Sequence, residues 1–186
     1  MTQKIILASS SPRRKELLAK IVTDFVVESS DFDEDEITHE IFRLPYELSR
    51  LKAYSVFAKH PNDIIIASDT IVVFENQVFS KPKTAEDAKN MLRNLSGRSH
   101  IVLTSYTIIS KTKEISKTTK TMVFFRVLSE NEIDEYIKTG APFDKSGGYA
   151  IQDKKLRPSE RIIGDIETVI GFPTKAISKD LKKFLS

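Results

Sequence analysis

The sequence contains no cysteine, which excludes disulfide bonds, thiolate nucleophiles and zinc sites built from thiolates. Histidine is scarce as well, because His39, His60 and His100 stand alone, without the spacing of metal ligands. A bound metal must therefore be held mainly by oxygen atoms. That requirement favours Mg²⁺ or Mn²⁺.

Long apolar runs are also absent. None approaches the ~20 residues needed to span a bilayer, and the apolar stretch near the N-terminus is too short for a signal peptide. We therefore expect a cytoplasmic protein with no membrane partner. The net charge of +3 is small, and Lys and Arg are spread along the chain, so we expect no nucleic-acid partner either. The 186 residues are 40% hydrophobic and show no repeat or linker, which predicts a single domain over residues 1–186.

The first segment, residues 4–18, predicts a strand, a polar turn and a helix, because an apolar run is followed by three serines and then by apolar residues at helical spacing. Ser11 is a suitable N-cap before Pro12, and Arg13 and Arg14 follow in the first turn, where they oppose the helix dipole. An anion would remove that conflict, which indicates a phosphate site. An ordinary capped helix with solvated arginines explains the pattern equally well.

Two acidic features are candidates for holding a cation. Residues 31–36 carry five acids, whose repulsion a cation would offset, although a solvated loop is the commoner fate of such a run. Asp69 lies between the strongly β-forming runs 64–67 and 71–74. Burying its carboxylate unpaired would be costly, so we expect Asp69 at a strand end, a bulge or a cleft, or bound to a cation. We assign it a functional role.

Pro45 predicts the start of a helix whose apolar face includes Leu44, Leu48 and Leu51. Lys52 falls on the opposite side of this helix. On the pattern alone, Lys52 is expected to be a surface lysine.

Later segments give clearer structural signals. Capping-box patterns at 84–87 and 129–132 predict two helix starts, and residues 100–109 and 119–128 predict two long strands of a hairpin. The adjacent glycines 147–148 suit either a close approach of the backbone to a ligand or a plain turn.

Five motifs stand in order along the chain: SSSPRRKELL at 9–18, SDT at 68–70, KP at 81–82, LSGRSH at 95–100 and DKSGGYAIQ at 144–152. In this order they resemble the Maf family of nucleoside triphosphate pyrophosphatases over essentially the whole chain. The resemblance implies an α/β, ITPase-like fold with a long curved mixed β-sheet, flanking helices and a central cleft between two lobes. It also implies a divalent metal, commonly magnesium, and a homodimer.

The resemblance implies catalytic roles for four residues. Asp69 matches the family's proposed general base, and Glu34, Lys52 and Lys81 match other catalytic positions. Glu34 and Asp69 are expected to hold the metal, and the sequence leaves open whether Asp69 is a ligand or a free base.

A second group of residues is expected to bind the substrate. Arg13, Thr70 and Gln152 match positions associated with the branch of the family that prefers dTTP and UTP. The complete expected set is Ser9, Ser11, Arg13, Arg14, Thr70 and Gln152. The chain departs from the family pattern at Ser68, where alanine or glycine is usual, and over residues 153–161, which lack the family's glycine-rich segment.

The expected reaction is hydrolysis of dTTP and UTP, or of modified pyrimidine nucleotides, to the monophosphate and pyrophosphate. Such chemistry needs positioning and charge neutralisation more than a covalent intermediate. It would be a house-cleaning reaction that limits incorporation of unwanted nucleotides. The alternative is a nucleotide-binding regulator of cell division or septum formation with weak or no catalysis.

Overall fold

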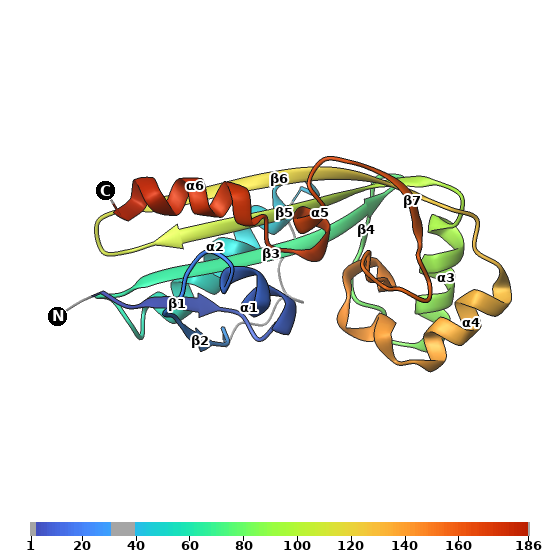
Figure 1. Cartoon of the computed structure of the whole chain (residues 1–186), viewed down its shortest axis with the longest axis horizontal. Helices are drawn as coiled ribbons and strands as arrows, with labels where there is room; N and C mark the ends of the chain where they lie inside the picture. The colour runs from blue at the N-terminus through green and yellow to red at the C-terminus, as the bar shows by residue number, and fades with distance from the viewer. Residues whose placement is uncertain (1–2, 31–39, 186) are drawn as a thin grey trace. The chain divides into compact units, whose positions relative to one another are not determined.

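The computed structural model describes residues 3–30 and 40–185 (Figure 1). Within them lie the strands β1 (Ile5–Ala8), β2 (Val26–Glu28), β3 (Ile64–Phe74), β4 (Gln77–Phe79), β5 (Ser99–Ile109), β6 (Glu114–Phe125) and β7 (Ser159–Ile163). The α-helices are α1 (Pro12–Leu18), α2 (Leu44–Phe57), α3 (Ala85–Leu95), α4 (Glu130–Lys138), α5 (Ile166–Ile170) and α6 (Thr174–Leu185). Two 3₁₀ turns, η1 (Ala141–Asp144) and η2 (Ser146–Gly148), complete the elements. None of the described helices combines the length and apolar character needed to cross a membrane.

The strands form one mixed sheet in the order β2-β1-β3-β5-β6-β7, with β4 paired to β3. Strand β1 is parallel to β2 and β3, whereas β4 is antiparallel to β3 and β7 is antiparallel to β6. The expected α/β fold with a mixed sheet and flanking helices is therefore confirmed. The central cleft between two lobes stays a prediction.

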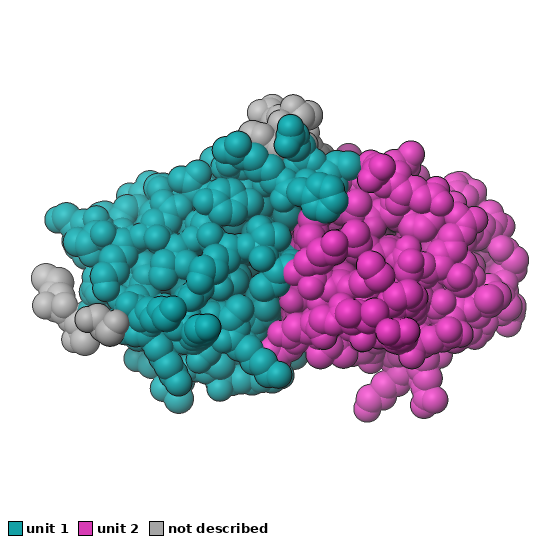
Figure 2. Space-filling model, turned by 90° about the horizontal axis from the view of Figure 1, so that it is seen from above, with its two compact units in different colours: residues 1–69, 104–119, 171–186 teal, residues 70–103, 120–170 magenta. Residues whose placement is uncertain are grey.

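The chain divides into two compact units, coloured separately in Figure 2. Unit 1 comprises residues 1–69, 104–119 and 171–186, and unit 2 comprises residues 70–103 and 120–170. Each unit has its own apolar cluster of buried side chains.

In unit 1, helix α2 packs on one face of the sheet. Alternation along β3 turns Ile65 and Ala67 toward the same face, where they join Ala53 and Val56 of α2 in the apolar cluster. The next residue of β3 with this orientation is Asp69. The strand pattern therefore sets the side chain of Asp69 toward α2.

In unit 2, both predicted capping boxes are confirmed. Thr84 and Asp87 cap α3 reciprocally, and Ser129 and Glu132 do the same for α4. The two helices contact each other. Each buries an apolar side in the core of this unit, because Leu92 and Ile133 belong to the same cluster as residues of β3 and β6.

The predicted hairpin exists, but its second strand is displaced from the expected range of 119–128. The Ser110 N–H donates to the Lys113 carbonyl at 2.9 Å, which closes the turn early and allows β6 to begin at Glu114. At the other end the Arg126 N–H donates to the Pro158 carbonyl at 3.0 Å, beyond the last residue of β6.

Candidate active site

The centre of the candidate site in unit 1 is an ion pair between α2 and β3. The Lys52 ammonium donates to Oδ1 of Asp69 at 2.5 Å, and the two side chains are only 7% and 6% exposed. Two oppositely charged groups removed from water interact much more strongly than a surface pair, and each offsets part of the other's desolvation. The pair therefore fixes both side chains in position.

This arrangement corrects the expectation for Lys52 and narrows the one for Asp69. Lys52 is buried rather than a surface lysine, because the buried face of α2 contains Ser49, Lys52 and Val56, which share one side of the helix at spacings of three and four. For Asp69 only the strand end is excluded, because the residue lies inside the continuous strand β3, and the cation beside it is the ammonium of Lys52. Apolar spacing alone did not reveal a helix face with a charged residue at its centre.

The second oxygen of the Asp69 carboxylate has no such partner. Among the described residues, Oδ2 is a buried side-chain atom without a hydrogen bond. A buried acceptor left unsatisfied is costly, so such an atom marks a place for a water, a cation or a substrate group. This oxygen fits one ligand position of a hard cation. No cluster of three His, Cys, Asp or Glu side chains suited to a metal occurs in the described part of the chain.

The predicted turn between β1 and α1 is held by serine and arginine side chains. Oγ of Ser9 accepts the Ser11 N–H at 3.2 Å and a guanidinium N–H of Arg14 at 3.5 Å. Nε of Arg14 also donates to the Gly171 carbonyl at 3.2 Å, and that carbonyl accepts the Ser68 hydroxyl at 3.0 Å. The structure thus brings Ser9 and Arg14 together and gives Ser68 a bond to the chain entering α6.

Ser11 stands at the N-cap position of α1, but its side chain makes no capping bond. The helix has 7 residues and begins with Pro12, as expected. Arg13 is half-buried in its first turn. The anion site expected at this turn stays a prediction.

The remaining predicted residues belong to unit 2. The Thr70 carbonyl accepts the Ser146 hydroxyl at 2.9 Å, and the Gly147 N–H donates to the Ser80 carbonyl at 3.1 Å. The glycine turn η2 is therefore tied to β3 and to the residue before Lys81. Lys81 itself is exposed.

Gln152 lies on an exposed turn directly after the buried side chain of Ile151. Within the residues that the structure describes, no hydrogen bond holds its amide. Its neighbours Ile151 and Leu156 are 8% and 3% exposed, so the turn is anchored on both sides by apolar side chains. The last predicted site residue, Glu34, lies outside the described residues.

A buried pair in unit 2, His100 with Tyr149, was not predicted as a contact. Nε2 of His100 and the Tyr149 hydroxyl are 2.6 Å apart, and both rings pack edge-on against Phe125. Desolvation by burial lowers the pKa of His100 to about 4 and raises the pKa of Tyr149. The sequence marked both residues only through the motifs, because His100 ends the motif at 95–100 and Tyr149 lies in the motif at 144–152.

The Asp69 carboxyl group is suited to act as a base or as a metal ligand. One oxygen of the Asp69 carboxyl group is held by Lys52, and the other has no hydrogen-bond partner among the described residues, so it has the unused acceptor that a general base or an oxygen ligand needs.

Comparison with known proteins decides the family. The model of the family described as Maf-like protein matches residues 4–184. The chain belongs to the Maf family.

Curated relatives match this Maf chain over nearly its full length. Proteins named dTTP/UTP pyrophosphatase are 43% identical in Pyrococcus furiosus, covering 95% of this chain and 93% of the relative, and 42% identical in Cytophaga hutchinsonii, covering 98% and 84%. The protein of the same name in a Geobacillus strain is 40% identical and covers 97% and 98%. Among solved structures, the Ham1 protein of Staphylococcus aureus aligns with a TM-score of 0.57 at 14% identity, covering 97% of this chain and 99% of that one. That likeness shows a shared fold.

Proposed function

We propose that this Maf protein is a dTTP/UTP pyrophosphatase that converts the triphosphate to the monophosphate and pyrophosphate. The observation that carries the proposal is the buried Asp69 carboxylate, with one oxygen paired to Lys52 and the other without a partner among the described residues. Relatives about 40% identical over almost the whole chain carry that name.

In the proposed mechanism a water attacks the α-phosphorus and gives its proton to Oδ2 of Asp69. The new bond joins the water oxygen to the α-phosphorus, and the bond from that phosphorus to the bridging oxygen breaks, so pyrophosphate leaves with the electron pair. Lys52 holds Oδ1 and prevents the carboxylate from turning away. Arg13 and Lys81 are assigned to neutralise charge on the phosphate oxygens.

A divalent cation, Mg²⁺ or Mn²⁺, is part of the proposal. Glu34 is proposed to hold it, and Asp69 holds it through Oδ2 in the alternative in which this oxygen is a metal ligand rather than the base. When bound, such an ion supplies charge neutralisation for the triphosphate and makes water easier to deprotonate.

Ser9, Ser11, Arg14, Thr70 and Gln152 complete the proposed substrate contacts. A carboxamide suits uracil and thymine, because it can accept from the N3–H and donate to a neighbouring carbonyl at once, whereas cytosine presents the reverse pattern. The Gln152 amide has no hydrogen bond to hold its orientation among the described residues. Because a free amide could turn to suit cytosine, selectivity also requires neighbours that lock the Gln152 amide, and a fixed backbone determines which neighbours it can reach.

The proposed role in the cell is house-cleaning, in which hydrolysis of dTTP, UTP or modified pyrimidine nucleotides limits incorporation of unwanted nucleotides. A cytoplasmic homodimer without a nucleic-acid partner is proposed with it.

The test is a pyrophosphate-release assay with UTP, dTTP, CTP, ATP and GTP, with Mg²⁺ or Mn²⁺ and after chelation. UTP and dTTP should give the highest kcat/KM, and chelation should abolish turnover. Asp69→Asn should lower kcat about 100- to 10,000-fold, as expected for loss of a general base. Lys59→Met is a matched control, because Lys59 is an exposed lysine of the same unit.

Because Lys52 and Asp69 are buried together, their variants need a separate check of folding. Rates for Asp69→Asn and Lys52→Met should be taken per folded protein, measured by circular dichroism well below the midpoint of unfolding. Undiminished hydrolysis by folded Asp69→Asn would remove Asp69 from the mechanism. Equal kcat/KM for UTP and GTP would remove the assignment to pyrimidine nucleotides.

A further inference from the structure

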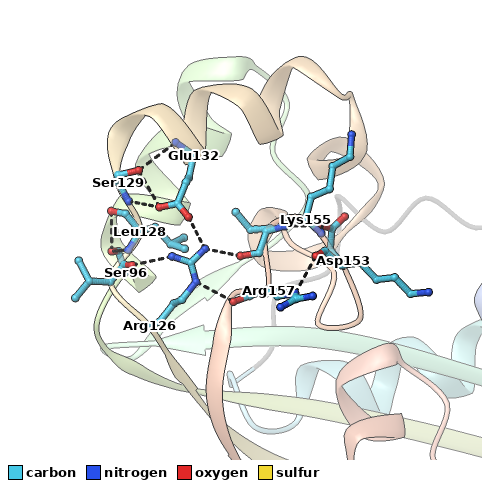
Figure 3. A network of polar contacts seen from close by, with 11 residues as sticks. Ser96, Arg126, Leu128, Ser129, Glu132, Asp153, Lys155 and Arg157 are labelled. Atoms are coloured by element: carbon cyan, nitrogen blue, oxygen red, sulfur yellow. Dashed lines mark hydrogen bonds and ion pairs between the residues drawn. The ribbon is translucent and has the colours of Figure 1, made fainter.

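Arg126, which no motif includes, binds three successive carbonyl groups of one loop. Figure 3 shows the bonds that its guanidinium makes. Its Nη2 donates to the Leu156 carbonyl at 2.6 Å and its Nε to the Arg157 carbonyl at 3.0 Å. Its backbone N–H donates to the Pro158 carbonyl at 3.0 Å. One residue thus fixes the path of the chain over three consecutive peptides.

The guanidinium of Arg126 is itself fixed from the other side by α4. Nη2 donates to Oε1 of Glu132 at 2.6 Å, and Oε2 of Glu132 accepts the Ser129 N–H at 2.9 Å and the Ser129 hydroxyl at 2.8 Å (Figure 3). The Arg126 guanidinium, followed by the Ser129 groups, lowers the pKa of Glu132 to about 2. Glu132 is therefore charged over the whole range in which an enzyme assay is run, and it holds Arg126 against the capped start of α4.

The loop that Arg126 holds is a single tight turn built without glycine. Oδ1 of Asp153 accepts the Lys155 N–H at 2.9 Å and the Leu156 N–H at 2.8 Å, and the Arg157 N–H returns to the Asp153 carbonyl at 3.1 Å (Figure 3). Arg157 closes the turn with a backbone φ of 43°. This left-handed conformation is one that residues other than glycine rarely adopt. Such a turn needs outside contacts to persist, and Arg126 supplies them.

This turn begins immediately after Gln152, the residue proposed to read the base. Gln152 is exposed and its amide is held by no hydrogen bond within the described residues, so only the backbone on its two sides sets its position. On the N-terminal side the buried Ile151 supplies that anchor, and on the C-terminal side the turn bound by Arg126 supplies it.

We propose that Arg126 is a positioning residue for base selection: it fixes the turn that follows Gln152 and so holds the backbone of Gln152 where its amide meets uracil or thymine and the neighbours that orient it. The inference rests on the proposed function. It assigns this positioning, exerted within the stretch 153–161, to Arg126 together with Glu132 and Asp153.

Arginine is required for this role because of its shape. Its planar guanidinium presents several N–H donors in fixed directions, which allows one side chain to bind two carbonyls and a carboxylate together. A lysine retains the charge but offers a single flexible ammonium group. Arg126→Lys is therefore a variant that keeps the charge near Glu132 while losing the fixed geometry.

The experiment compares kcat and KM for UTP and CTP in the wild type, Arg126→Lys, Arg126→Gln and the control Arg93→Met. Arg93 belongs to the same unit and pairs with Glu130 through two bonds of 2.8 and 2.7 Å, but it holds no carbonyl of the turn. The ratio of kcat/KM for UTP to that for CTP should fall about tenfold in Arg126→Lys, mainly through a higher KM for UTP. Arg93→Met should keep the wild-type ratio.

Hydrogen–deuterium exchange gives a readout that does not depend on turnover. The peptide covering residues 151–158 should exchange faster in both Arg126 variants and not in Arg93→Met. Faster exchange with an unchanged UTP to CTP ratio would overturn the inference, because Arg126 would then be structural only. Unchanged exchange in folded Arg126→Lys and Arg126→Gln would overturn it as well. A wild type that hydrolyses no triphosphate would instead overturn the proposed function, and the base-reading role with it.

Discussion

Asp69 shows how one residue can combine a structural and a chemical role. Its Oδ1 is paired with Lys52 and its Oδ2 has no partner among the described residues. Removing one member of a buried ion pair typically costs about 3–5 kcal/mol, because the other charge is left without compensation. Replacing Lys52 therefore changes both stability and charge at the candidate site. The effect of Lys52 on hydrolysis has to be read from protein that is still folded.

His100 is predicted to make the protein sensitive to mild acid. Burial lowers its pKa from 6.5 to about 4, so in this range the unfolded chain binds a proton that the folded protein does not. The contribution of His100 to the free energy of unfolding is therefore fully present above pH 6.5, the pKa of histidine in the unfolded chain, and is lost as the pH falls from 6.5 toward 4. The shift corresponds to about 2 kcal/mol between pH 7 and pH 5 and to about 3 kcal/mol at full extent.

Urea unfolding at a series of pH values, in the wild type and in His100→Gln, measures this contribution. Glutamine can still form a hydrogen bond with the Tyr149 hydroxyl, but it does not titrate. The Asp and Glu side chains contribute equally to the pH dependence of unfolding in both proteins. The free energy of unfolding of the wild type should therefore fall more steeply between pH 7 and pH 5. Parallel curves for the two proteins would contradict the assignment to His100.

The turn η2 depends on a glycine that has both an unusual backbone and a crowded position. Gly147 has φ of 72°, and a Cβ built there would lie 3.0–3.2 Å from atoms of the Val72 side chain. Gly140 has φ of 73°, yet a Cβ there would meet no atom within 4 Å. The two glycines thus separate the cost of the left-handed conformation from the cost of crowding.

Gly140→Ala should lower the free energy of unfolding by about 1 kcal/mol, the cost of a left-handed alanine. Gly147→Ala should lower it by about 2–4 kcal/mol, because overpacking against β3 adds to that cost. Chemical denaturation of both variants at one pH is the measurement. Equal losses would mean that Val72 gives way and that close packing of η2 on β3 has little energetic weight.

Local signals were the part of the structure that the sequence could predict. The capping boxes of α3 and α4, and the strand before Ser9, depend on neighbouring residues and were found from their patterns. The burial of Lys52 could not be found in this way, because it depends on Asp69, which lies 17 residues further along the chain. The role of Arg126 was not predicted for the same reason, because the loop carbonyls that its side chain binds lie 30 and 31 residues further along the chain.

At the scale of the molecule, three of the four places where the chain passes from one unit to the other lie inside strands. The boundaries after Asp69, Leu103 and Thr119 fall within β3, β5 and β6 respectively. If one unit unfolded alone, each of these strands would be folded in one half and unfolded in the other. The two units are therefore not independent folding domains of the usual kind, which are joined by exposed linkers.

We predict that the two units unfold together, as expected for a single domain over residues 1–186. The chain contains no tryptophan, so one can be introduced as a probe in each unit. Phe57→Trp reports on unit 1, where Phe57 is partly buried beside the apolar cluster, and Phe124→Trp reports on unit 2, where Phe124 is partly buried in β6. Fluorescence of both variants and circular dichroism should give coincident urea transitions, because the shared strands couple the units. Two separated midpoints in either variant would show that one unit keeps its fold after the other is lost.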